Sequence, residues 1–118
     1  MARKTRKSSK TRRAPKADRH VYVIDLDRSV LTKKGFAKKN PGYVEGKPCV
    51  YVGMSVHEPR VRYEQHKRGY KPNRFAHQYG QYVRARSCRS GLTWEQAVEA
   101  EVAVAERLRR RGWAVWQN

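Results

Sequence analysis

Two short runs of β-branched and aromatic residues most constrain what this chain can fold into. Residues 20–26 (HVYVIDL) and 49–54 (CVYVGM) each have the length of one strand and enough apolar side chains to be buried. Pro48, which has no N–H to offer a sheet, suits the start of the second strand. Residues 81–86 (QYVRAR) alternate and predict a third, partly exposed strand. The sheet is therefore expected to be small and antiparallel.

The best-signalled helix lies near the end of the chain. Thr93 is followed three residues later by Gln96, which predicts a capping box, and Gly112 follows three arginines as a helix stop. Apolar side chains recur between them at about 100° per residue and predict one buried face. These residues are Trp94, Ala97, Val98, Val102, Val104, Ala105 and Leu108.

The remaining segments are shorter and more polar. Residues 59–68 begin with Pro59 and are followed by Gly69, which predicts a helix between the two. We expect residues 70–80 to form a short helix or a loop, and residues 27–47 to form a long basic loop with at most one helical turn. Together with the strands this predicts an α+β fold, and 118 residues allow one domain.

The charge of the chain points to a polyanionic partner. With 28 Lys and Arg against 10 Asp and Glu, the formal net charge is +18. Residues 1–19 are rich in basic residues and contain no large apolar side chain after Met1, so we expect a disordered basic arm that tethers phosphates or only adds solubility. Residues 20–118 form the domain. Nucleic acid is the expected partner and an anionic membrane surface the second choice.

The sequence argues against export, membrane insertion and zinc binding. No apolar run approaches the roughly 20 residues of a membrane span, and no apolar stretch follows the charged N-terminus. We therefore expect a cytoplasmic, nucleoid-associated protein in which Cys49 and Cys88 are free thiols. Neither cysteine is spaced with a histidine as zinc ligands are.

One acidic residue lies where an acid is costly. Glu101 has Ala97 and Val98 before it and Val104 and Ala105 after it, at helical spacing, so it lies near the centre of the apolar face. A buried carboxylate needs a metal ion, an arginine or a water-filled cleft. Glu106 lies at the edge of the same face, where pairing with a surface arginine is expected.

Four further residues are candidates for chemistry. Arg62 and His66 are four residues apart and share one face of the helix over 59–68, where they form either a phosphate-binding surface or an active-site pair. Tyr22 and Tyr51 lie in the middle of the two apolar strands, so each hydroxyl needs a partner. Two ordinary core tyrosines remain the alternative.

These residues, in this order, resemble the GIY-YIG nuclease superfamily, and in particular its small stand-alone bacterial members. The resemblance covers about residues 20–118 and is carried by Val21-Tyr22, Tyr51-Val52-Gly53, Arg62, His66, a helical Glu and Asn118. It implies a three-stranded antiparallel sheet flanked by helices. It also implies one divalent ion, Mg²⁺ or Mn²⁺, and hydrolysis of phosphodiester bonds in DNA.

The resemblance also implies a role for each matched residue. Glu101 would hold the metal ion, and Arg62 would bind the phosphate. Tyr22 and Tyr51 would be the two motif tyrosines, His66 matches a histidine of some branches, and Asn118 matches the late asparagine. Glu106 has the spacing to the last residue that the repair-incision branch shows, so both acids stay open, as does the identity of the base among the tyrosines and His66.

The resemblance thus predicts a divalent-metal-dependent endonuclease that acts on DNA, with RNA as the alternative nucleic-acid partner, and with no small-molecule substrate and no membrane. The alternative is a basic nucleic-acid-binding module without catalysis, either a degenerate nuclease fold or a ribosome-associated protein. The segment between the two tyrosines is long and rich in lysine, which suggests contacts with the nucleic-acid backbone. The expected binding residues are Lys33, Lys34, Lys38, Lys39, Lys67, Arg68, Lys71 and Arg74.

Overall fold

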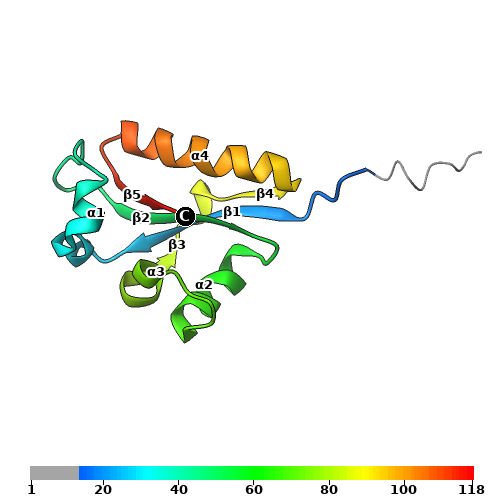
Figure 1. Ribbon diagram of the computed structural model, residues 1–118, viewed down its shortest axis with the longest axis horizontal. Helices are drawn as coiled ribbons and strands as arrows, with labels where there is room; N and C mark the ends of the chain where they lie inside the picture. The colour runs from blue at the N-terminus through cyan, green and yellow to red at the C-terminus, as the bar shows by residue number, and fades with distance from the viewer. Residues whose placement is uncertain (1–13) are drawn as a thin grey trace, which may run out of the picture.

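A mixed five-stranded sheet forms the centre of the protein, with helices on both faces (Figure 1). The computed structural model describes residues 14–118. The strands are β1 (Arg19–Leu26), β2 (Cys49–Ser55), β3 (Gly80–Val83), β4 (Arg89–Leu92) and β5 (Ala114–Gln117). The helices are α1 (Lys34–Lys38), α2 (Pro59–Arg68), α3 (Arg74–Tyr79) and α4 (Trp94–Arg110), with short 3₁₀ helices η2 (Arg28–Thr32) and η3 (Ala85–Ser87). The α+β class is confirmed.

The sheet is larger than the three antiparallel strands expected. Those three are present, in the order β3-β1-β2, and are antiparallel, but β4 also pairs with β1 and β5 adds a parallel strand beside β2. Sequence alone missed the two additions because each has only four residues. A period-2 pattern cannot be established over so short a run, and β4 carries a single large apolar residue, Leu92.

Strand β1 is buried on both faces, and alternation sends its side chains to two separate cores. Val21 and Val23 pack with residues of α4 in one core, whereas Tyr22 and Ile24 belong to the other. In Figure 1, α4 covers one face of the sheet, and α2 and α3 lie against the opposite face. The tyrosines therefore point toward α2 and α3.

Helix α4 has the predicted capping box, in which Thr93 and Gln96 satisfy each other's backbone N–H groups. Its buried face consists of Ala97, Ala100, Glu101, Val104, Ala105 and Leu108. The predicted face was wrong for three residues, since Trp94, Val98 and Val102 are 57%, 38% and 40% exposed. Val98 and Val102 lie about 60° and 100° around the helix from Glu101, at 100° per residue, and Trp94 is the first helical residue.

The lysine-rich segment between β1 and β2 is more ordered than the long loop expected. It contains η2 and α1 and is attached to β5 through Asn40. The Asn40 amide donates to the carbonyls of Phe36 and Val115 at 2.9 and 3.1 Å, and its oxygen accepts from the Val115 N–H at 2.7 Å. This amide satisfies the edge of β5 as a further strand would, and it fixes α1 against the sheet.

The two shorter helices and the two cysteines agree with the sequence. Helix α2 has the predicted bounds and ends at Gly69, whose φ of +86° favours glycine. The predicted short helix in residues 70–80 is α3. The arm ends one residue earlier than expected, because Arg19 begins β1, and residues 1–13 lie outside the described residues. Cys49 and Cys88 are free thiols, as expected. Within residues 14–118, no helix combines the length and the apolarity that crossing a membrane requires.

Candidate active site

The register between β1 and β2 brings the two tyrosines together. Tyr22 lies opposite Gly53 and Ile24 lies opposite Tyr51, so the tyrosines are diagonal neighbours on the same face of the sheet. Their ring centroids are 5.9 Å apart, and each residue is 1% exposed. Two buried phenols side by side require polar partners at their hydroxyl ends.

Gly53 makes the approach of the two hydroxyls possible. A Cβ atom at this position would lie 2.6 Å from Tyr22 Oη and 3.0 Å from Tyr51 Oη. Both distances are shorter than carbon–oxygen contacts in packed interiors, so any side chain at position 53 would displace the hydroxyls. The glycine thus leaves a space into which both phenols point their polar ends.

We therefore expect Gly53→Ala to destabilise the protein by about 1–3 kcal/mol, because the added methyl group overpacks this space. Denaturant unfolding of both proteins measures the difference. Gly42→Ala is the matched control, since a Cβ atom at position 42 meets nothing within 4 Å. Equal stabilities of the two alanine variants would show that the tyrosines can move aside at no cost.

His66 holds the Tyr22 hydroxyl from the α2 side. Its Nδ1 accepts the backbone N–H of Asn73 at 2.9 Å, so Nε2 carries the ring proton and donates it to Tyr22 Oη at 2.9 Å. The side chain is fully buried, and burial lowers the pKa of His66 to about 4, with the charge of Arg62 acting in the same direction. His66 is thus a neutral hydrogen-bond donor at physiological pH.

The two tyrosines differ in their surroundings. Burial raises the pKa of both, but the Tyr51 hydroxyl and the Arg62 guanidinium oppose this rise at Tyr22. At Tyr51, the neighbouring Tyr22 adds to the effect of burial, and only Arg62 opposes it. The geometric difference is that the Tyr22 hydroxyl accepts the Nε2–H of His66.

Arg62 is held by neutral acceptors. Its Nη1 donates to Gln65 Oε1 at 3.0 Å and to the Tyr70 carbonyl at 3.2 Å, and its Nη2 donates to the Lys71 carbonyl at 2.6 Å. Lys71 has a φ of +42°, a strained conformation for a non-glycine residue, in the same turn that supplies these carbonyls. The guanidinium is fixed in place while its positive charge is retained.

That charge is not neutralised by a carboxylate. The salt bridges within residues 14–118 are Arg84–Asp25 at 2.7 Å and Arg19–Asp18 at 2.6 Å, and neither includes Arg62. Arg62 lies close enough to both tyrosine hydroxyls to lower the pKa of each. A fixed and uncompensated guanidinium beside two phenols is suited to an incoming anion such as a phosphodiester.

Glu101 is buried, with 8% of its surface exposed, on the α4 side of the sheet. Its Oε1 accepts from Gln117 Nε2 at 3.2 Å, and its Oε2 is buried without a hydrogen-bond partner. Burial raises the pKa of Glu101, and the Gln117 amide partly opposes this rise. Burying the carboxylate is therefore costly, and only one of its two oxygens has a hydrogen-bond partner.

Glu101 and the tyrosines interact although they come from opposite faces of the sheet. The carboxylate raises the pKa of both Tyr22 and Tyr51, so it lies within electrostatic range of the hydroxyls. Strand β5 ends at Gln117, beside Val52, and does not extend along β2 to Gly53. The acid and the two phenols thus influence one another electrostatically from the two sides of the sheet.

The residues around Glu101 fit a magnesium ion better than a zinc ion. Within residues 14–118 there is no group of three or more His, Cys, Asp or Glu that could hold a metal ion. Mg²⁺ keeps several waters and is often held by one carboxylate together with substrate phosphates. The unpartnered oxygen of Glu101 meets that requirement, whereas Glu106 is exposed on the outer side of α4.

The last two residues of the chain differ in their surroundings. Asn118 is exposed, and its backbone N–H donates to the Val52 carbonyl at 3.3 Å. The side-chain amide of Gln117 contacts Glu101. Sequence reasoning missed Gln117 because its inward direction depends on the alternation of a strand that was not predicted, in which Val115 and Gln117 share one face.

The predicted nucleic-acid-binding residues fall into two groups. Seven are exposed, namely Lys33, Lys34, Lys38, Lys39, Arg68, Lys71 and Arg74. Lys67 is half-buried, and its ammonium group donates to the carbonyls of His77 and Gly80 at 3.1 and 2.9 Å. The lysine at position 67 therefore joins α2 to α3 and β3, a structural role that its charge alone did not reveal.

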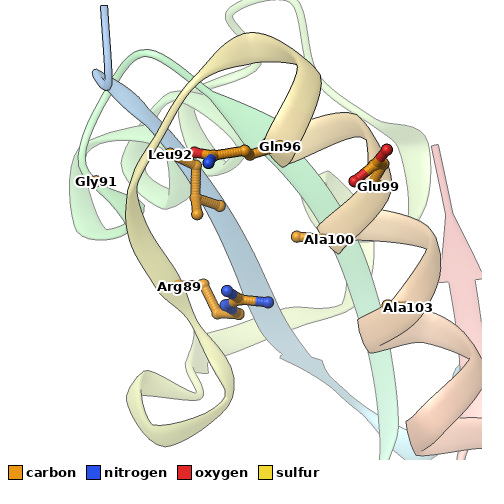
Figure 2. Close-up of a pocket in the computed structure, with 7 residues that line it drawn as sticks. All are labelled: Arg89, Gly91, Leu92, Gln96, Glu99, Ala100 and Ala103. Atoms are coloured by element: carbon orange, nitrogen blue, oxygen red, sulfur yellow. The ribbon is translucent and has the colours of Figure 1, made fainter.

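A separate hollow of about 460 Å³ lies between β4 and α4 (Figure 2). Arg89 extends into it from β4 toward Ala100 and Ala103, and Glu99 lies on the opposite side. Its lining includes neither Glu101 nor Arg62, His66, Tyr22 or Tyr51. In the comparisons with known proteins, no family model, no curated protein and no solved structure matches this chain.

Proposed function

We propose that this protein is a divalent-metal-dependent endonuclease of the GIY-YIG type that hydrolyses phosphodiester bonds in DNA. The observation that carries the proposal is the pair of phenols beside Gly53, one of which is bound by His66. An uncompensated arginine and a buried acid with one unpartnered oxygen lie within electrostatic range of both phenols. The three antiparallel strands that the resemblance implies correspond to β3-β1-β2, which lie within a larger mixed sheet of five strands.

Glu101 is the residue that would hold the metal ion, through Oε2, while Gln117 fixes the orientation of the carboxylate through Oε1. When bound there, magnesium would polarise the scissile phosphate and lower the pKa of nearby hydroxyls. Arg62 would bind a non-bridging oxygen of the same phosphate and stabilise the charge that develops on it. In hydrolysis, the oxygen of water bonds to phosphorus as the ester P–O bond breaks.

Tyr22 is the residue that would accept the proton of the attacking water. The Nε2–H of His66, the Tyr51 hydroxyl and the Arg62 charge all favour its phenolate form. His66 is unsuited to that role because both of its ring nitrogens are occupied, one by the Asn73 N–H and one by its own proton. We assign His66 as a positioning residue for Tyr22. The proton would leave with the departing oxygen or pass to solvent.

The partner follows from charge. A net charge of +18 and exposed lysines around α1 and α3 favour a nucleic-acid duplex or single strand. DNA is the substrate that the resemblance implies, with RNA as the other polymer of the same backbone chemistry. A protein of this kind would act at the nucleoid in the cytoplasm.

The proposal is tested with purified protein and a panel of substrates: supercoiled plasmid, duplex, single-stranded, flapped and branched DNA, and RNA. We expect cleavage of at least one DNA form with Mg²⁺ or Mn²⁺ and none with a chelator, because one carboxylate cannot polarise the phosphate alone. If the protein binds these substrates but cleaves none of them with any divalent metal, the non-catalytic binding module is the correct function.

A further inference from the structure

A cationic surface lies beside the candidate active site, on the side where α1 packs against β5. It consists of Lys39, Arg109 and Trp116, together with Lys33, Lys34 and Arg74 next to them, and we call it the α1–β5 surface. The six residues line two depressions of about 280 Å³ each. Together, the linings of the two depressions contain five cations and no carboxylate. The salt bridges within residues 14–118 involve none of these cations.

Trp116 connects the two depressions. The Lys39 ammonium lies 6.0 Å and the Arg74 guanidinium 5.6 Å from the centre of its ring. The ring is itself fixed, with Phe36 nearly parallel at 6.3 Å and Phe75 edge-on at 4.8 Å. Two cations from separate helices are thus placed over one immobile aromatic ring.

The surface is rigidly attached to the sheet. Arg109 donates to Asn40 Oδ1 at 3.3 Å and to the Val115 carbonyl at 2.9 Å. The same Asn40 binds α1 and β5 together, so the backbone of α1 and the Arg109 guanidinium keep a fixed position relative to Trp116. A guanidinium that is held in place without an acidic partner loses little freedom when it binds a phosphate.

The surface is continuous with the candidate active site. Gln117 lines the depression that contains Lys39, Arg109 and Trp116, and its side-chain amide contacts Glu101 at 3.2 Å. An extended strand whose scissile phosphate lies at Glu101 could therefore continue over the end of β5. The second depression, lined by Lys33, Lys34 and Arg74, adds basic groups from α1 and α3.

We propose that the α1–β5 surface binds the phosphodiester backbone of the substrate strand on one side of the scissile phosphate. The proposal deepens the function proposed above and rests on it for the position of the scissile phosphate. Lys39 and Arg74 contact consecutive phosphates beside Trp116, and Lys33 and Lys34 extend the path. The surface reads no base edges, so the binding it supplies is independent of sequence.

The test compares wild type with the double variant Lys39→Gln/Arg74→Gln. Affinity for a fluorescein-labelled single strand and for a duplex is measured by anisotropy, with a chelator present, between 50 and 200 mM salt. We expect the slope of log affinity against log salt to be shallower by about 1.4 for the single strand and 1.8 for the duplex, because two phosphate contacts are lost. Where the protein cleaves, KM rises and kcat is kept.

The control is Arg107→Gln/Arg110→Gln, which removes the same charge from exposed positions of α4 and should leave the slope closer to that of wild type. Lys39→Gln alone, at an exposed position, should make the slope shallower by about half as much. This single variant keeps the test valid if the double variant misfolds. A slope unchanged in both Lys39 variants, or lowered equally by the control, overturns the proposal.

The two proposals fail separately. Protein that never cleaves but shows the slope change would refute the nuclease and support the phosphate-binding surface. Protein that cleaves with metal but shows no slope change would keep the nuclease and refute the surface.

Discussion

Glu101→Gln should reduce metal-dependent cleavage by about 10³-fold or more, while affinity for DNA in the presence of a chelator stays at the wild-type level. The amide has the shape of the acid and can still contact Gln117, but it has no negative charge with which to hold Mg²⁺. The loss corresponds to several kcal/mol of transition-state stabilisation, which is what a metal acting on a phosphoryl oxygen contributes. Single-turnover cleavage of a labelled oligonucleotide measures the effect.

The same substitution should change stability in a way that identifies the metal site without any activity. Burial raises the pKa of Glu101 above its unfolded value, so the metal-free folded protein gains stability as the pH falls through the folded-state pKa. Glu101→Gln removes this dependence and should be the more stable protein at pH 7, by a margin that shrinks toward pH 4. In thermal unfolding, added Mg²⁺ should raise the unfolding temperature of wild type and leave that of the variant unchanged.

Glu106→Gln is the control for both measurements, because Glu106 lies on the same helix, is exposed and has the same charge. It should cleave DNA like wild type. If Glu106→Gln lost cleavage and Glu101→Gln kept it, the inward position of Glu101 would have no catalytic meaning, and the metal would be held on the outer side of α4.

Local patterns in the sequence were sufficient to predict the elements that carry most of the site. The strands around Tyr22 and Tyr51 contain several adjacent apolar residues, and the capping box of Thr93 sets the start of α4 and hence the phase of the helix. Helical periodicity then placed Glu101 on the buried face. These predictions depend on residues that are neighbours in the chain, which is why sequence alone could make them.

The parts that sequence did not predict depend on long-range contacts. Gln117 reaches Glu101 only because β5 pairs with β2 after the turn at Gly112, and the pairing of two distant short strands leaves little local signal. The hydrogen bond from His66 to Tyr22 likewise needs the turn between α2 and α3, where the Asn73 N–H fixes the ring tautomer. The exposure of Val98 and Val102 depends on which face of α4 packs on the sheet, and a helix pattern alone does not contain that information.

The roles of the two tyrosines could not be separated from sequence, since both lie in the middle of apolar strands. Their partners separate them. Tyr22 accepts the Nε2–H of His66, whereas Tyr51 shares with it the space beside Gly53. We therefore propose Tyr22, and not Tyr51, as the proton acceptor.

Tyr22→Phe should accordingly lower the cleavage rate by about 10²–10⁴-fold, the range for the loss of a positioned proton acceptor. Its pH dependence is the sharper test. Because the pKa of Tyr22 is raised above its ordinary value of 10, the phenolate fraction in wild type grows with pH across the measurable range. The rate should rise about tenfold per pH unit between roughly pH 6 and 8 and level off where a bound metal has lowered this pKa.

Tyr63→Phe is the matched control, because it removes the same phenolic hydroxyl from a half-buried tyrosine outside the candidate site. The Tyr63 hydroxyl donates to the Gln81 carbonyl at 2.7 Å. It should keep both the rate and the pH profile of wild type.

Tyr22→Phe should show a low rate that no longer rises with pH. A Tyr22→Phe protein whose rate still rose tenfold per pH unit would mean that another group takes the proton, and Tyr51 would then be the residue to replace next, since it shares the space at Gly53.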